Sequence, residues 1–238
     1  GYDSKTDIHC PMYIDYEESE KYCKSDGVKP YIQCEYAHAM GNSEGGFKEY
    51  WDLIRKYPKY QGGYIWDFVD QGLRDKSPIT GKEIFTYGGD YGRYPASDYN
   101  FNCNGIIAPD RRLNPHAYEI QYWHQNVWIK DLDAVNGAFN IYNENFFKNI
   151  DDLHLTATIY ANGVKLSTVE IPETKGIAPQ TTKMVKSDAL KYAIAEAETE
   201  HGKEEITVNF AFASDGTEPL VEKGQVMARQ QFVINEYQ

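Results

Sequence analysis

The sequence predicts two folds in series, an α/β segment over residues 1–125 and an all-β segment over residues 126–238. In the first segment short apolar runs alternate with loops and one helical pattern, which is typical of parallel β/α units. In the second, apolar and polar residues alternate over short stretches between turn signals, which is typical of antiparallel sheets. The 238 residues suit one large domain or two ordinary ones.

The first segment is expected to hold three strands and one helix. Three short apolar runs have strand character, at residues 7–12, 30–34 and 64–69. Between the last two runs, apolar residues recur at helical spacing, namely Phe47, Tyr50, Trp51 and Ile54. We expect this helix to be capped by Asn42 or Ser43 and to end before Pro58. Strand, helix and strand joined by short links favour parallel pairing.

The second segment shows repeated strand alternation. Three of its strands are expected at residues 153–159, 206–212 and 226–232. Asn162-Gly163 and Lys223-Gly224 are turn signals. Five to seven short antiparallel strands over roughly a hundred residues predict an immunoglobulin-like β-sandwich. Residues 188–200 have a helical composition, so they are expected to form a short helix or a loop insertion.

Composition argues against several function classes. The formal net charge is −12, and an acidic surface repels phosphate backbones, so nucleic acid is not an expected partner. No apolar run reaches about 18 residues, so no membrane insertion is expected. Aromatic residues form 14% of the chain, and flat rings suit sugars as well as cores. The cysteines show no framework or zinc spacing, and Cys10 and Cys34 are expected to be buried thiols.

One carboxylate occupies an unusual place. Glu35 directly follows a buried strand, and the polar His38 comes shortly after it. Tyr13 and Trp66 lie at the ends of the other two expected strands. Because parallel strands of a β/α fold end at one edge, these groups are expected to face one pocket. An acid beside aromatic and hydrogen-bonding groups suits a sugar, although a lone acid at a strand end is more often a salt-bridged structural residue.

Five strings of this sequence occur in the same order in the large bacterial β-galactosidases of glycoside hydrolase family 2, which it resembles. They are TDIHCPMY, CEYAHAMGNS, GGYIWDFVDQ, YGGDYG and FNCNGIIAPDRRLNPHAYE. The resemblance is dense over residues 6–125 and looser beyond, where FNIYNENFFKNIDDLHL resembles the opening of the family's fourth domain. It implies that residues 1–125 are the C-terminal portion of an incomplete (β/α)8 TIM-barrel catalytic domain. Residues 126–238 would then be the immunoglobulin-like β-sandwich that follows.

The resemblance also implies a role for each matching residue. Glu35 is expected to be the nucleophile of a retaining β-galactosidase, which forms a covalent galactosyl-enzyme from terminal non-reducing β-D-galactose. Tyr13 is expected to hydrogen-bond this carboxylate and keep it ionised and aimed. His38, Trp66 and Asn104 are expected to contact the sugar, with Trp66 as an aromatic platform. Each of three residues also has a purely structural alternative. Tyr13 would be a core tyrosine with a hydrogen-bonded hydroxyl, His38 a hydrogen-bonded structural histidine and Trp66 a core tryptophan.

Metal ions follow from the same resemblance. The full-length family uses magnesium and sodium. Phe101, through its backbone carbonyl, and Asn104, through its side chain, are expected to ligate sodium, since oxygen ligands suit a hard cation. The family's third protein ligand to sodium is an Asp far upstream that has no match here. The magnesium ligands are not expected in this chain.

A retaining glycosidase needs a second carboxyl group about 5–5.5 Å from the nucleophile. The acids that precede Glu35 match no family motif; they are Asp3, Asp7, Asp15, Glu17, Glu18, Glu20 and Asp26. Residues 15–20 are expected to form a solvated loop. Asn143-Glu144 imitates a family-like Asn-Glu pair but lies in the second segment. We therefore expect a fragment whose general acid/base lies outside this chain and which is inactive alone.

Four further acids lie in the matching strings, namely Asp67, Asp70, Asp90 and Asp110. We expect them to be buttressing acids paired with Arg74, Arg111 or Arg112. Two alternatives stay open: a non-catalytic carbohydrate-binding or scaffolding protein with a half-site, and a sister β-glucuronidase or β-mannosidase. The natural galactoside and the compartment, cytoplasmic or periplasmic, are left open, and the full-length protein is expected to be a homo-oligomer.

Overall fold

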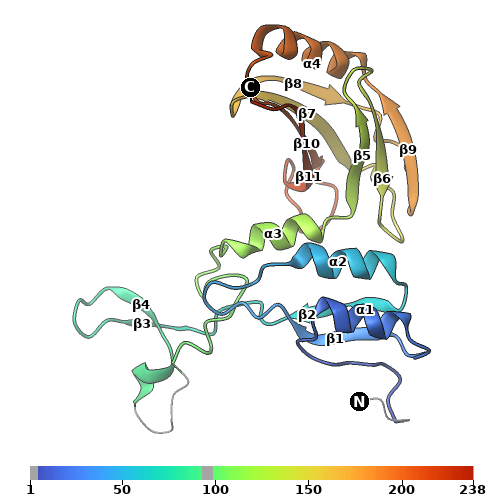
Figure 1. The fold of residues 1–238 in the computed structure, drawn as a ribbon. Coiled ribbons are helices and arrows are strands. Elements are labelled where there is room, and N and C mark those ends of the chain that lie inside the picture. The colour runs from blue at the N-terminus through green and yellow to red at the C-terminus, as the bar shows by residue number, and fades with distance from the viewer. Residues whose placement is uncertain (1–4, 93–98, 238) are drawn as a thin grey trace. The chain divides into compact units, whose positions relative to one another are not determined.

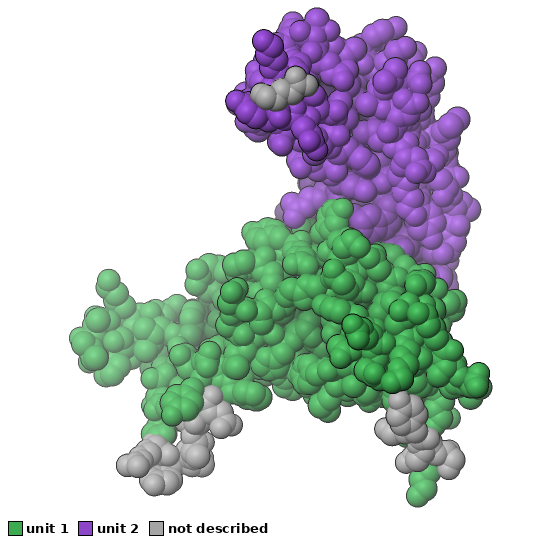
Figure 2. Space-filling model, in the orientation of Figure 1, with its two compact units in different colours: residues 1–123 green, residues 124–238 purple. Residues whose placement is uncertain are grey.

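The computed structural model describes residues 5–92 and 99–237. The chain divides into two compact units, unit 1 over residues 1–123 and unit 2 over residues 124–238 (Figure 2). Each unit has its own core, and the two are described separately. Among the described residues, no helix is both long enough and apolar enough to cross a membrane.

Unit 1 is a mixed α/β structure (Figure 1). Its elements are α1 (Tyr16–Lys24), β1 (Tyr31–Tyr36), α2 (Phe47–Lys56), β2 (Tyr60–Ile65), β3 (Leu73–Lys76), β4 (Glu83–Thr86), the 3-10 helix η1 (Gly88–Tyr91) and α3 (His116–Trp123). β1 and β2 pair in parallel with α2 between them in sequence, so the predicted β/α arrangement is confirmed. β3 and β4 form a separate antiparallel hairpin. The described part of the chain contains no closed barrel.

Two predicted strands differ from the observed ones. Residues 7–12 were expected to be a full strand, but they contact β1 through isolated parallel bridges from His9 to Tyr31 and from Met12 to Glu35. The strand expected at 64–69 begins earlier and ends at Ile65, because the two glycines before Tyr64 continue the ladder with β1. Both shifts leave Tyr13 and Trp66 just beyond the ends of their segments.

The expectation of a solvated loop over residues 15–20 is wrong, because this stretch begins helix α1. The Asp15 side chain caps the helix by accepting a hydrogen bond from the Glu18 amide at 2.9 Å. The charges are paired on the outer face, where Glu20 lies 3.0 Å from Lys24 and 2.8 Å from Lys56. The residues buried on the inner face are Ser19, Tyr22 and Cys23.

Helix α2 begins later than expected, and neither Asn42 nor Ser43 caps it. The N-cap is Gly46, which has φ +78° and makes no side-chain capping bond. A Cβ atom at Gly46 would lie 1.9 Å from the Tyr16 hydroxyl, so glycine fits this close approach as well as the left-handed conformation. The Ser43 hydroxyl instead donates to the His38 carbonyl at 2.6 Å.

The core of unit 1 is rich in tyrosine. Tyr31 and Tyr60 are almost fully buried and lie 4.6 Å apart between ring centroids. The Tyr31 and Ser19 hydroxyls are 2.9 Å apart, so the ring is both packed and hydrogen-bonded. Burial of Cys10 and Cys34 was expected, but Cys10 is exposed and Cys34 is only partly covered. Part of the aromatic content that suggested sugar contacts therefore lies in this core.

Unit 2 is built mainly from antiparallel strands. Its elements are β5 (Val127–Asp133), β6 (Ala138–Asn143), β7 (Leu153–Ala161), β8 (Val164–Ile171), β9 (Thr181–Lys186), α4 (Asp188–His201), β10 (Ile206–Ser214) and β11 (Val226–Asn235). One sheet has the order β11-β10-β7-β8 and the other the order β5-β6-β9. Residues of both sheets share one apolar cluster, in which the Phe139 and Phe210 rings lie 5.0 Å apart.

The alternating patterns of unit 2 predicted its strands well. β7 buries alternate residues from Leu153 to Ala161, and β10 buries those that the alternation selected. Asn162 and Gly163 both have positive φ in the β7–β8 hairpin, as a tight two-residue turn requires. Of the two alternatives for residues 188–200, the helix is observed as α4, with the Ser187 side chain capping Leu190.

Candidate active site

Glu35 lies in an irregular part of β1. The register pairs Gln33 with Gly63 and Tyr36 with Ile65, so β1 spans three steps where β2 spans two. This extra residue is the signature of a β-bulge, which re-aims a side chain. Gln33 and Tyr36 are buried, whereas Glu35 between them is partly exposed. The bulge therefore explains how a buried strand can end in an accessible carboxylate.

Tyr13 is bound to Glu35 twice. Its backbone amide donates to the Glu35 carbonyl at 2.9 Å, and its hydroxyl donates to Glu35 Oε2 at 2.7 Å. Burial raises the pKa of the Tyr13 phenol, and the hydrogen bond to Glu35 and its charge raise it further. The phenol therefore keeps its proton at neutral pH and acts as a donor to the carboxylate.

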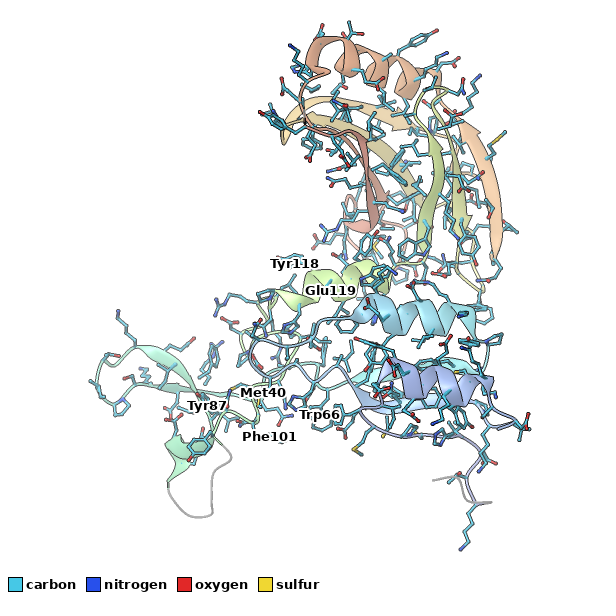
Figure 3. All side chains as sticks on the ribbon, in the orientation of Figure 1. Met40, Trp66, Tyr87, Phe101, Tyr118 and Glu119 are labelled. Atoms are coloured by element: carbon cyan, nitrogen blue, oxygen red, sulfur yellow. The ribbon has the colours of Figure 1, made fainter. Side chains whose placement is uncertain are left out.

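His38 and Phe101 continue the group around Tyr13. The His38 ring centroid lies 6.0 Å from that of Tyr13 and 5.7 Å from that of Phe101. Figure 3 labels Phe101 and Trp66 in unit 1. The half-buried Trp66 is tied through its backbone, because its amide donates to the Tyr36 carbonyl and its carbonyl accepts from the Ala39 amide. Segments that are distant in sequence thus meet beside Glu35.

Asn104 is the candidate metal ligand that the structure buries most completely, with 1% exposure. Its Nδ2 donates to the Phe101 carbonyl at 2.8 Å. Its Oδ1 is buried and has no hydrogen-bond partner among the described residues. A buried oxygen without a partner is costly, and a hard cation is satisfied by such oxygens. Since a carbonyl has two lone pairs, Phe101 and Asn104 fit the expected sodium ligands.

Gly105 directly follows Asn104, and both of its backbone groups are hydrogen-bonded. Its amide donates to Asp70 Oδ1 at 2.7 Å, and its carbonyl accepts from Asn114 Nδ2 at 2.9 Å. His116 Nε2 also lies within hydrogen-bond distance of that carbonyl, at 3.0 Å. A Cβ atom at Gly105 would lie 2.0 Å from the Asp70 amide nitrogen. The position therefore requires glycine, and these contacts fix the peptide next to Asn104.

The expected pairing of the four acids with arginine is correct for Asp110, which lies 2.6 Å from Arg112. The other three bind different partners. Asp70 holds Gly105, Asp67 accepts from Gln71 at 2.6 Å, and Asp90 accepts from the Tyr87 amide at 2.9 Å. Turn amides and neutral side chains lie nearer to these carboxylates than the guanidinium groups do; Arg74, for example, pairs with Glu83 at 3.5 Å.

Glu44 is a buried acid that the sequence analysis did not single out. Its side chain is 0% exposed, and Oε2 lies 2.9 Å from His116 Nε2. Burial raises the pKa of Glu44 to about 8, and the charge of Glu119 adds to the effect. The polar surroundings GNSEGG gave no signal of burial. Gln33 was also missed; it is polar, fully buried and two residues before Glu35.

Three of the upstream acids considered as partners of Glu35 have structural roles at α1. Asp15 caps the helix, Glu18 pairs with Lys21 at 3.1 Å, and Glu20 pairs with Lys56. Asp3 lies outside the described residues. In the Asn143-Glu144 pair, Glu144 accepts from the Trp128 indole at 2.8 Å within unit 2.

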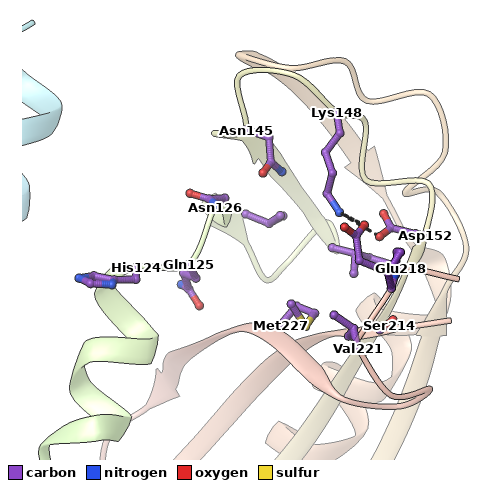
Figure 4. A pocket seen from close by; sticks show the side chains of 13 residues that line it. His124, Gln125, Asn126, Asn145, Lys148, Asp152, Ser214, Glu218, Val221 and Met227 are labelled. Atoms are coloured by element: carbon purple, nitrogen blue, oxygen red, sulfur yellow. Dashed lines mark hydrogen bonds and ion pairs between the residues drawn. The ribbon is translucent and has the colours of Figure 1, made fainter. Parts of the chain in front are cut away.

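Unit 2 also contains a pocket, shown in Figure 4. Two acids line it, Asp152 and Glu218, and Lys148 lies 3.1 Å from the first and 2.6 Å from the second. Both carboxylates are thus bound to one ammonium group. This arrangement stabilises the loops that surround the pocket and does not resemble an acid and a nucleophile poised across a substrate.

Comparison with known proteins finds two family matches along the chain. Residues 3–129 match the family described as "Glycosyl hydrolases family 2, TIM barrel domain", and residues 139–235 match "Beta-galactosidase, domain 4". The β-galactosidase of Leuconostoc mesenteroides is 34% identical over 96% of the chain and 22% of its own length. That of Clostridium acetobutylicum is 45% identical over 64% of the chain and 16% of its own length. The chain thus spans about a fifth of such relatives, and it belongs to glycosyl hydrolase family 2.

Proposed function

We propose that this chain carries the nucleophile side of a retaining β-galactosidase active site. The observation that supports this most is the hydrogen bond from the Tyr13 hydroxyl to Glu35 Oε2, at 2.7 Å, on a bulge at the end of a parallel strand. The names of the relatives, which are β-galactosidases, supply the substrate class. His38, Trp66 and Asn104 are proposed to contact the galactose.

In this proposal Glu35 attacks the anomeric carbon of the sugar. Because Tyr13 binds Oε2, Oε1 is the oxygen that forms the new carbon–oxygen bond. The bond to the aglycone oxygen breaks, and a second carboxyl group protonates that oxygen. A water molecule, deprotonated by the same group, then opens the glycosyl ester and restores Glu35. Two inversions give net retention.

The surroundings of Glu35 suit this chemistry. A neutral phenol donates to one carboxylate oxygen and holds the group in one orientation, which reduces the reorganisation needed for attack. The partly exposed His38 can donate to or accept from sugar hydroxyls. A sodium ion held by the Phe101 carbonyl and Asn104 Oδ1 would supply a positive charge that orients hydroxyl groups.

The second carboxyl group and the magnesium ligands are proposed to lie on segments outside this chain. Three acids at α1 support this, since Asp15, Glu18 and Glu20 are engaged in capping and ion pairs. The parallel β1–β2 pair and the family match over residues 3–129 support an incomplete portion of a (β/α)8 barrel. From the family resemblance, we also propose that unit 2 has an immunoglobulin-like topology. We propose as well that the full-length protein is a homo-oligomer.

The test compares hydrolysis of nitrophenyl-β-galactoside by the 238-residue chain and by a longer polypeptide that adds the rest of the barrel. We expect the longer polypeptide to be active, its Glu35→Gln variant to be inactive, and the chain alone to lose at least about 10²-fold in rate without its acid/base partner. Glu49→Gln, which changes an exposed carboxylate of α2, is the matched control. Turnover by the chain alone at a rate close to that of the longer polypeptide, or an active Glu35→Gln variant, would overturn the proposal.

A further inference from the structure

Gln33 has a fully buried side-chain amide that makes two hydrogen bonds to the backbone of Ile14. Its Oε1 accepts from the Ile14 amide at 2.8 Å, and its Nε2 donates to the Ile14 carbonyl at 3.2 Å. Nε2 also donates to the Tyr60 hydroxyl at 2.9 Å. The side chain is 0% exposed. Both polar atoms of the amide are therefore used, which fixes its orientation.

Ile14 directly follows Tyr13, whose backbone is in an uncommon conformation. Tyr13 has φ +52°, in the left-handed region that a bulky side chain rarely adopts. Such a conformation persists where the surroundings over-determine it. On one side the Tyr13 amide donates to the Glu35 carbonyl, and on the other Gln33 holds both backbone groups of Ile14. These bonds fix the turn that brings the Tyr13 hydroxyl to Glu35 Oε2.

Two tyrosines from other elements add hydrogen bonds to this group, Tyr50 to Ile14 and Tyr60 to Gln33. The Tyr50 hydroxyl of α2 donates to the Ile14 carbonyl at 3.1 Å, so this carbonyl accepts from two side chains. Tyr60, at the start of β2, is 2% exposed, and burial raises its pKa, so its hydroxyl stays neutral. β1 and α2 thus both bind the backbone of Ile14, and β2 holds the Gln33 side chain through Tyr60. A residue that only filled space here would make none of these bonds.

We propose that Gln33 is a positioning residue that acts on Glu35 through Tyr13. It holds Ile14 so that the left-handed Tyr13 keeps its hydroxyl on the carboxylate, and it does not touch the substrate. This inference rests on the proposed roles of Tyr13 and Glu35 in glycoside hydrolysis. Without the hydrogen bonds from Gln33 to Ile14, Tyr13 can relax to an ordinary backbone conformation. The 2.7 Å hydrogen bond from Tyr13 to Glu35 is then lost.

The first experiment is a double-mutant cycle in the longer polypeptide. Gln33→Met keeps the length of the side chain but removes its hydrogen bonds, and we expect kcat to fall about tenfold while KM changes little. In a Tyr13→Phe background, the same substitution should change kcat by less than about twofold, because the hydroxyl that it positions is already absent. A full tenfold loss in both backgrounds, or no loss in either, would overturn the proposal.

Ser19→Ala is the matched control for lost buried hydrogen bonds. Ser19 is also buried and bonds to Tyr31 of β1, whereas the side chains that hydrogen-bond to Ile14 are those of Gln33 and Tyr50. We expect kcat to stay within about twofold of the parent enzyme. A loss as large as that of Gln33→Met would show that any weakening of this layer lowers the rate, and the specific role of Gln33 would then be wrong.

The second experiment does not depend on activity. The 238-residue chain is labelled with ¹³C at the tyrosine Cζ atoms, and the signal that disappears in Tyr13→Phe is assigned to Tyr13. We expect this signal to shift in Gln33→Met and to stay in place in Ser19→Ala. An unchanged Tyr13 signal in Gln33→Met would refute the positioning role. A shifted signal in a protein that proves inactive on galactosides would leave the positioning role intact and refute the proposed reaction.

Discussion

Replacing Glu44 with Gln should change the pH dependence of stability. The Glu44 carboxyl has its pKa raised from 4.5 to about 8, mainly by burial. Between these values the unfolded chain loses the proton that the folded chain retains. The contribution of the protonated Glu44 side chain to the free energy of unfolding is therefore fully present below about pH 4.5. It is lost as pH rises through about 8. From about pH 4.5 to pH 7 the loss amounts to about 3 kcal/mol, at about 1.4 kcal/mol per pH unit.

The assay is urea unfolding of the parent chain and of Glu44→Gln at several pH values. The two free energies of unfolding should agree within about 0.5 kcal/mol near pH 4.5, because the neutral amide resembles the protonated acid. At pH 8 the variant should be more stable by about 4 kcal/mol. Taking the difference between variants cancels distant groups that titrate in both. Glu49→Gln should show no such divergence, since Glu49 is exposed.

Parallel stability curves for the parent chain and Glu44→Gln would refute the reasoning. They would mean that Glu44 is ionised in the folded state near pH 7, held by the His116 ring 2.9 Å away. In that case Glu44→Gln should instead lose stability at neutral pH, because the contact that holds the ionised carboxylate would be removed.

Three further predictions concern the site and the two cores. Tyr13→Phe removes the hydrogen bond to Glu35 and should lower kcat of the longer polypeptide by about 10–100-fold, since bonds to charged groups contribute about 1.5–3 kcal/mol; steady-state kinetics that show an unchanged kcat would contradict it. Gly105→Ala should destabilise unit 1 by about 1–3 kcal/mol, because its Cβ meets backbone atoms, and urea unfolding followed by tryptophan fluorescence would test this. Leu155→Ala should cost about 2–5 kcal/mol in unit 2, and a calorimetric transition that stays at the parent temperature would be inconsistent with its burial.

Strands and helices with a clear apolar period could be predicted from the sequence. β7 and β10 bury alternate residues along their length, so the alternation alone identifies their inner faces. Helix α1 could not be recognised in the same way, because charges dominate its sequence. Those charges pair across the surface, and the apolar side is short. The cap of α2 was missed for a related reason, since Gly46 acts through backbone geometry and leaves no side-chain signature.

For the site, the meeting of Tyr13 and Glu35 could be predicted because they lie near the ends of two neighbouring parallel segments. The roles of Gln33 and Glu44 could not, since each depends on contacts made only in the folded chain. Gln33 looks like an ordinary polar residue in a strand, yet it bonds to Ile14 and Tyr60. Glu44 lies in a polar stretch that resembles a solvated loop, yet its side chain is fully buried.

The most direct test of the central claim is covalent trapping of the nucleophile. A 2-deoxy-2-fluoro-β-galactoside with a good leaving group slows the opening of the glycosyl ester more than its formation, so the intermediate accumulates. Peptide mass spectrometry of the labelled longer polypeptide should find the sugar on Glu35, and the Glu35→Gln variant should stay unlabelled. A sugar attached to any other carboxylate would contradict the assignment of Glu35 as the nucleophile.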